Sequence, residues 1–151
     1  MTEEIAELFR RANFATVRLS FESVRGPART ASDGKAEPQD LEKALNCLRR
    51  AGYERGEVDV YMLIGLRGQS EEEIIDTADF IHELGGHIRL AQYSPVPGTP
   101  LFEEDARAIA KLADEPLLHN STVAAAWGGD LDRYQRLKDY VRGLNRDLGN
   151  E

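Results

Sequence analysis

The 151-residue sequence predicts an α/β fold made of three parallel β/α units, which is part of a larger β/α barrel. Short apolar segments alternate with amphipathic helical patterns along the first two thirds of the chain. Glycine-containing turns separate these elements. Strands joined through helices have to run parallel, and a closed barrel takes about eight of them. Three such strands therefore predict an open, partial barrel.

The N-terminal region predicts a helix over Thr2–Arg11 followed by a strand over 16–23. Thr2 suits the N-cap, and one side of the helix is apolar through Ile5, Leu8, Phe9 and Ala12. The strand TVRLSFES alternates with a period of two, with Val17, Leu19 and Phe21 on one side and Arg18, Ser20 and Glu22 on the other. Parallel strands are normally apolar on both faces, so the polar row is expected to line an active-site cavity.

The second unit has a polar connector over 24–38, whose length is typical of functional loops. A helix follows from Pro38 to Ala51, because proline suits the first helical position and Gly52 suits the end. The chain's one cysteine, Cys47, lies in this helix. A single cysteine forms no internal disulfide and cannot hold a metal cluster alone, so we expect it to be packed in the core.

The central stretch from Val58 to Glu73, VDVYMLIGLRGQSEEE, predicts a strand, a turn at Gly65 and Gly68, and a helix that continues to Leu84. Ser70 and Glu73 have the spacing of a capping box. Phosphate binding at this turn is disfavoured, because the spacing fits neither G-x-G-x-x-G nor the Walker motif. The three glutamates at 71–73 would also repel an anion.

A third strand is predicted over Ile88–Tyr93, and the proline-rich segment SPVPGTPLF ends it. Helices are expected over Phe102–Ala113 and Asp130–Leu148, with the loop DEPLLHNS between them. Trp127 is expected to be a packing anchor. The three histidines have no metal-ligand spacing, and His82 is expected on the solvated side of its helix.

Composition excludes several classes of protein. A net charge of −8 argues against a general nucleic-acid binder. The apolar runs are too short for a membrane span, and the N-terminus has no signal-peptide pattern, so a cytosolic location is expected. Ligands of α/β proteins bind at the carboxyl ends of the strands. The candidate residues there are Glu22, Ser23, Leu63, Gly65, Tyr93 and Ser94.

Four segments in this order resemble the second half of the core of radical S-adenosylmethionine (radical SAM) enzymes: VRLSFES, LEKALNCLRRAGY, VYMLIGLRGQSEEEI and RLAQYSPVPGTPLF. The resemblance covers roughly Thr2 to Glu104, and DEPLLHNS is similar to the tail of members that carry a cobalamin-binding domain. It implies that residues 1–104 form the last three units of a partial (β/α)6 barrel. Residues 105–151 would be a helical extension packed on it.

The resemblance also implies a partial S-adenosylmethionine site. Glu22, with Ser20 beside it, would contact the nucleoside or amino-acid part, and Lys35 would reach the carboxylate. Tyr61 and Leu63 would face the ribose and adenine, and Tyr93 and Ser94 would lie beside the adenine. Gly65 completes the set of cofactor-binding candidates at the end of the second strand.

The chain departs from the family pattern because it lacks the C-x-x-x-C-x-x-C loop that holds a [4Fe–4S] cluster. We therefore expect no radical chemistry from this chain alone. The first hypothesis is a fragment of a radical SAM enzyme whose parent uses S-adenosylmethionine, the cluster and, in the cobalamin-associated subset, cobalamin on a small-molecule substrate. The second is a binding or scaffold half-barrel that assembles with itself or with a cysteine-bearing partner. A third is a β/α enzyme unrelated to this family.

The first two hypotheses share one structural expectation. Both leave strand edges exposed at 16–23 and 88–93, and unpaired edges drive association. The sequence therefore predicts a dimer or a higher oligomer, without contacts to nucleic acid or membrane.

Overall fold

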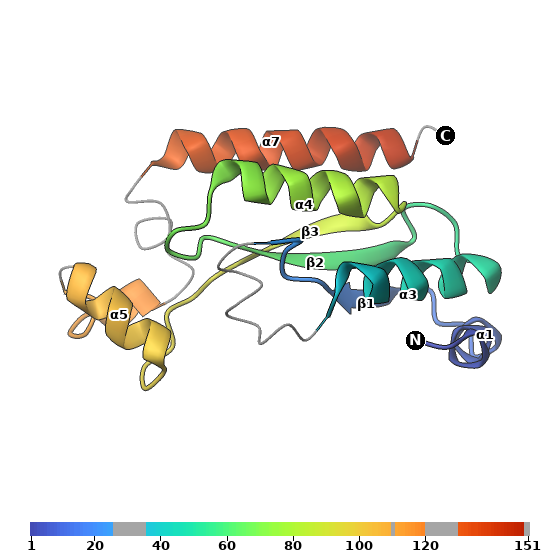
Figure 1. Cartoon of the computed structure of the whole chain (residues 1–151), viewed down its shortest axis with the longest axis horizontal. Helices are drawn as coiled ribbons and strands as arrows, with labels where there is room; N and C mark the ends of the chain where they lie inside the picture. Colours follow the sequence, from blue (N-terminus) through green and yellow to red (C-terminus); the bar gives the residue numbers. More distant parts are fainter. Residues whose placement is uncertain (26–35, 110, 120–129, 150–151) are drawn as a thin grey trace.

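The computed structural model describes residues 1–25, 36–109, 111–119 and 130–149. Figure 1 shows an elongated molecule in which helices and strands alternate along most of the chain. The elements are, in order, α1 (Glu3–Arg11), β1 (Val17–Ser20), α3 (Pro38–Arg50), β2 (Val58–Ile64), α4 (Glu71–Glu83), β3 (His87–Gln92), α5 (Pro100–Ala108), the 3₁₀ turn η1 (Pro116–His119) and α7 (Leu131–Leu148).

The three strands form one parallel sheet in the order β1-β2-β3. Val17 pairs with Val58 and Asp59 pairs with His87, so the register is fixed across the whole sheet. This confirms the predicted α/β architecture of three parallel strands in an open, partial barrel. In the described chain β1 and β3 are the two edges, as the sequence predicts.

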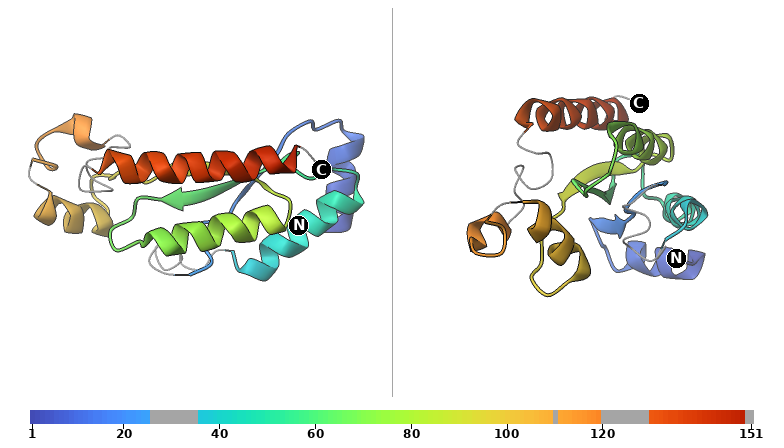
Figure 2. Two further views of the ribbon diagram at one scale, coloured as in Figure 1. Left: turned by 90° about the horizontal axis from the view of Figure 1, so that it is seen from above. Right: turned by 60° about the vertical axis from the view of Figure 1, so that its left-hand side comes forward.

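The sheet has one helix-covered face and one open face. Val17 and Val58 start the covered face, which continues through Phe21, Val60, Met62, Ile64 and Ile88, all of them nearly inaccessible to solvent. Helices α3, α4 and α7 lie on this side (Figures 1 and 2). The opposite face carries Arg18, Ser20, Asp59, Tyr61, Leu63 and Arg89, because side chains alternate along a strand. The polar row predicted for the first strand therefore extends across the sheet.

A close backbone approach joins α4 to the sheet. Gly86 precedes β3, and a Cβ atom there would lie 2.8 Å from Val60 Cγ2 and 2.9 Å from Ile81 Cγ2. Any larger residue would push α4 off the covered face, so Gly86 allows the packing on which the core depends. Helix α7 packs on α4 and β3 at the C-terminal end of the chain.

Cys47 is buried, at 7% exposure, as predicted. The apolar side of α1 is only partly used by the fold: Phe9 packs against the core, whereas Ile5 and Leu8 are 42% and 50% exposed. One other expectation about a side chain was wrong. His82 is half-buried rather than solvated, and its Nδ1 atom is inaccessible to solvent.

The ends of two elements also differ from prediction. Helix α5 covers Pro100–Ala108 rather than Phe102–Ala113, because Thr99 caps it by accepting the Phe102 N–H and proline suits its first position. It therefore crosses the domain boundary expected after residue 104, and that boundary stays a prediction. The strand predicted over 16–23 is regular only from Val17 to Ser20. No described helix combines the length and apolar character needed to cross a membrane. Trp127 lies outside the described residues.

Candidate functional site

Four of the predicted site residues meet on the open face near the carboxyl ends of β1 and β2. Ser20 pairs with Tyr61 in the parallel register. One step further, the Leu63 N–H donates to the carbonyl oxygen of Glu22 at 3.3 Å. Ser20 and Tyr61 therefore form one row across the sheet, and Glu22 and Leu63 form the next.

The polar groups of these rows are not used by the fold. Within the described chain, the side chains of Ser20, Glu22 and Tyr61 form no hydrogen bond or ion pair. Ser20 is exposed, whereas Glu22 and Tyr61 are half-buried. A hydroxyl, a carboxylate and a phenol that converge without internal partners are available to a ligand with several polar groups.

Gly65 has a different role from these residues. It is buried, with φ of +88°, and its N–H donates to Gln69 Oε1 at 2.8 Å. The same Gln69 donates from Nε2 to the Leu63 carbonyl oxygen at 2.9 Å, which closes the turn between β2 and α4. Gly65 thus shapes the turn, and its N–H group is already bonded to Gln69. Sequence reasoning missed Gln69, whose only signal is its place four residues after Gly65.

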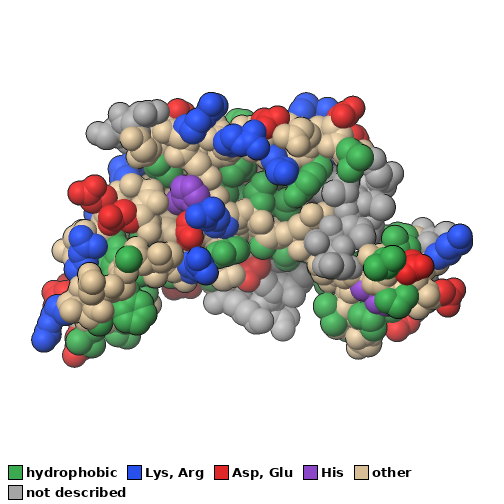
Figure 3. Space-filling model, turned by 180° about the vertical axis from the view of Figure 1, so that it is seen from behind, with side chains coloured by type: hydrophobic (Ala, Val, Ile, Leu, Met, Phe, Trp, Pro, Cys, Tyr) green, Lys and Arg blue, Asp and Glu red, His purple; other side chains and the backbone are tan. Residues whose placement is uncertain are grey.

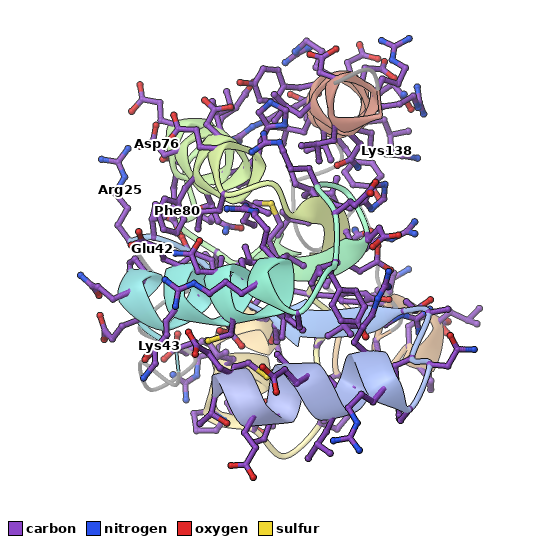
Figure 4. All side chains as sticks on the ribbon, turned by 90° about the vertical axis from the view of Figure 1, so that its right-hand side faces the viewer. Arg25, Glu42, Lys43, Asp76, Phe80 and Lys138 are labelled. Carbon is purple, nitrogen blue, oxygen red and sulfur yellow. The ribbon has the colours of Figure 1, made fainter. Side chains whose placement is uncertain are left out.

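A buried polar network fixes the chain that follows Glu22. Ser23 Oγ lies 2.9 Å from Glu73 Oε1 and 3.2 Å from Thr77 Oγ1 on α4. Arg25 forms an ion pair with Asp76 of the same helix, and Figure 4 shows the two side chains next to each other. Helix α4 therefore holds the end of β1 in place.

This network changes one expectation about the capping box. Ser70 accepts the Glu73 N–H at 3.0 Å, as predicted for the start of α4. Glu73, however, is 3% exposed, and its carboxylate bonds to Ser23, 50 residues away in sequence. The Glu73 carboxylate, which the capping-box motif assigns to the start of α4, is therefore used in a tertiary contact instead.

Tyr93 lies on the far side of the site, beside the end of β2. Its N–H donates to the Ile64 carbonyl oxygen at 2.8 Å, which places it next to Gly65. Burial and the nearby carboxylates of Asp105 and Glu104 raise the pKa of Tyr93 to about 12, so its hydroxyl stays protonated at neutral pH.

Helix α5 is held at this end of the sheet. Arg67, in the turn after β2, lies 3.4 Å from Asp105 Oδ1 and donates to the Glu104 carbonyl oxygen at 3.1 Å. Figure 1 shows α5 beyond the carboxyl ends of β2 and β3. Ser94 is half-buried between Tyr93 and Pro95. Lys35, the remaining predicted site residue, lies outside the described residues.

The residues of the chain do not fit an iron–sulfur cluster. Such a cluster needs several thiolates, whereas the single Cys47 is packed in the core on α3. No three potential metal ligands gather anywhere in the described part of the chain. On the open face, by contrast, unpaired polar groups lie beside the half-buried Leu63.

The comparisons with known proteins support the fold. No family model and no curated protein matches the chain. A solved structure described as "Coproporphyrinogen III oxidase (HemN) from Escherichia coli is a Radical SAM enzyme" is similar, with a TM-score of 0.62 and 16% sequence identity. The match covers 95% of this chain and 30% of that one. The chain therefore shares the fold of part of a radical SAM enzyme and spans about a third of its length.

Proposed function

We propose that this chain forms the second half of the S-adenosylmethionine site of a radical SAM enzyme core. The observation that carries the proposal is the meeting of Ser20, Glu22 and Tyr61, all without internal partners, at the carboxyl ends of parallel strands. The fold shared with a part of HemN and the ordered sequence segments support it.

In this proposal the chain's residues bind and orient the cofactor. The Glu22 carboxylate accepts hydrogen bonds from hydroxyl or ammonium groups of the cofactor. The Tyr61 hydroxyl, in the neighbouring row, can donate or accept a further hydrogen bond. Leu63 offers apolar contact to a ring between them. The bound cofactor would supply the radical chemistry, with the electron coming from a reduced [4Fe–4S] cluster held outside this chain.

The cluster itself has to be held by cysteines outside this chain, since Cys47 is alone and buried. We therefore place the complete activity in a longer protein or in an assembly. The similarity of DEPLLHNS to the tail of cobalamin-associated members favours a parent with a cobalamin-binding domain.

The proposal is tested by titrating S-adenosylmethionine into the isotopically labelled chain and recording amide chemical shifts. We expect shifts confined to residues 20–22 and 61–65, and a loss of about tenfold or more in affinity for Glu22→Gln, because one charge-assisted hydrogen bond contributes about 1.5–3 kcal/mol. Glu72→Gln is the matched control, since Glu72 is exposed on α4 away from the open face. Shifts elsewhere, or an equal loss in both variants, would refute the assignment.

A binding or scaffold half-barrel is the second candidate, and the exposed apolar side of α1 favours it. Ile5 and Leu8 lie on the helix that precedes the edge strand β1. A further β/α unit, from a partner or a second copy, would cover both. Light scattering separates the cases: a concentration-dependent assembly that Leu8→Glu abolishes supports the scaffold. A stable monomer contradicts it, and an in-frame C-x-x-x-C-x-x-C sequence upstream of Met1 in the gene favours the enzyme.

A further inference from the structure

Along the outer edge of β3, the backbone hydrogen-bonding groups are paired at one residue and unpaired at the next two that point outward. Hydrogen bonding alternates along a strand, and Tyr93 bonds inward to β2, so the backbone groups of Ile88, Leu90 and Gln92 point outward. The side-chain amide of Asn145 on α7 pairs with both backbone groups of Ile88: it accepts the N–H at 2.8 Å and donates to the carbonyl oxygen at 2.9 Å. No described residue does the same for Leu90 or Gln92.

The Asn145 contact shows what this edge accepts. The side-chain amide of Asn145 presents one donor and one acceptor in the manner of the peptide group of a neighbouring strand. It occupies the backbone groups of Ile88 only, so the groups of Leu90 and Gln92 remain available to pair with an added strand. Unpaired edge positions of this kind are sites of strand addition.

The hollow beside this edge is basic. Its volume is about 420 Å³, and it is lined by His87, Arg89, Leu90, Lys138, Val141, Arg142, Asn145 and Arg146. The lining includes four lysines or arginines and no acidic side chain, although the whole chain has a net charge of −8. Figure 3 shows basic side chains gathered over α7 and again over the adjoining sheet.

The positive wall comes from a helical repeat. Lys138, Arg142 and Arg146 recur at every fourth position of α7, which places them on one side of the helix. Figure 4 shows Lys138 on this helix, where its Nζ atom lies 5.3 Å from the ring centre of Tyr134.

Nearby acidic groups neutralise only part of this charge. Asp59 Oδ1 accepts the Arg89 Nε–H at 2.9 Å, but the same carboxylate also faces Arg18 and His87. Asp139 pairs with Arg142 from the outer side of α7. Lys138 forms no ion pair among the described residues, and the one carboxylate of Asp59 is shared by Arg18 and Arg89, so positive charge remains along the groove.

We propose that the β3 edge, from Leu90 to Gln92, binds an extended acidic peptide segment of another protein by strand addition. The backbone of the segment would pair with Leu90 and Gln92, and its carboxylates would face Lys138, Arg142 and Arg146. A second copy of this chain is disfavoured at the same edge, because two basic grooves would be brought together. The inference does not depend on the S-adenosylmethionine site, which lies on the open face.

The experiment uses a fluorescein-labelled, end-blocked hexapeptide of alternating Glu and Val, with alternating Lys and Val as the charge control. Fluorescence anisotropy should show at least about tenfold tighter binding of the acidic peptide at low salt. Hydrogen exchange should slow by about tenfold or more at the Leu90 and Gln92 amides in the complex, because both become paired.

Two variants with the same change of charge locate the site. Lys138→Glu should weaken binding of the acidic peptide by about tenfold, whereas Arg136→Glu, an exposed α7 residue outside the groove lining, should have little effect. Lys138→Gln gives a milder second test should Lys138→Glu disturb folding. The proposal is overturned by absence of binding, by equal loss in the two charge-reversed variants, or by binding that leaves Leu90 and Gln92 exchange unchanged. The last result would indicate a general anion site on α7.

Discussion

The hydroxyl of Ser23 lies 2.9 Å from Oε1 of Glu73, which joins the residue after the candidate site on β1 to the first turn of α4. Both residues are almost completely buried, at 2% and 3% exposure. Thr77 Oγ1 and the Arg25 carbonyl oxygen complete the surroundings of the Ser23 hydroxyl. The position of Glu22 on the open face thus depends on a contact made on the covered face.

Removal of the Glu73 carboxylate should destabilise the chain. We expect Glu73→Ala to lower the free energy of unfolding by about 1–3 kcal/mol, because the buried Ser23 hydroxyl loses its carboxylate partner. Glu73→Gln should retain most of the stability, since an amide can still bond to Ser23. Urea unfolding measures both. Glu72→Ala is the exposed control, expected within about 0.5 kcal/mol of wild type, and a similar loss in Glu72→Ala would contradict the assignment.

Gln69 should be equally important to the turn after β2. Gln69→Ala leaves the buried Gly65 N–H and the Leu63 carbonyl oxygen without their side-chain partner, so we expect a loss of about 1–3 kcal/mol in the free energy of unfolding. Amide shifts of residues 63–66 should change at the same time. Gln39→Ala, at an exposed position of α3, provides the comparison. An unchanged turn in the spectrum of Gln69→Ala would show that Gln69 does not hold it.

Asn145→Ala should weaken the attachment of α7 to the sheet. Two hydrogen bonds to Ile88 are lost, and the expected decrease in the free energy of unfolding is about 1–3 kcal/mol. The Ile88 amide should exchange with solvent faster, and more than the amides of β2, because only the edge loses a partner. The control is Asn46→Ala on α3, where the half-buried amide bonds only to Arg49 of the same helix. Equal exchange rates at Ile88 in the variant and wild type would contradict this role.

The pKa of Tyr93 predicts a pH dependence of stability. The pKa is raised from 10.0 to about 12 in the folded chain, so the folded state retains the phenolic proton that the unfolded state releases. The contribution of this group is present below pH 10 and is lost as the pH rises to about 12. Tyr93→Phe has no such proton to retain.

The test compares urea unfolding of wild type and Tyr93→Phe across this interval. The free energy of unfolding of the variant should rise relative to wild type as the pH increases from about 10 to about 12. Tyr140→Phe is an informative companion, because the Tyr140 hydroxyl donates to Asp79 and its pKa is also raised to about 12. A difference between wild type and Tyr93→Phe that stays constant over the interval would refute the prediction.

Much of the fold could be predicted because its signals are local. The period of two in TVRLSFES, the cap at Ser70 and the proline at position 38 each act within a few residues, and the structure confirms the elements that they mark. Boundaries were less well predicted where two local signals compete, as at α5, which starts at Pro100 and ends four residues after Glu104.

In the candidate site, too, some features could be predicted from local patterns and others could not. Alternation by itself puts Ser20 with Glu22, and Tyr61 with Leu63, on shared sides of their strands. Only the register of β1 against β2 makes the two pairs neighbours, and a shift of one residue would have turned one pair to the covered face.

The sequence by itself determined the three β/α units, the polar side of the first strand and the burial of Cys47, because these depend on periodicity and residue type. Tertiary structure alone decided that Glu73 reaches Ser23, that Asn145 covers Ile88, and that Ile5 and Leu8 stay exposed. The reason is physical: a carboxylate, an amide or an apolar side chain can be satisfied by many partners. Which partner it meets depends on how elements distant in sequence pack together.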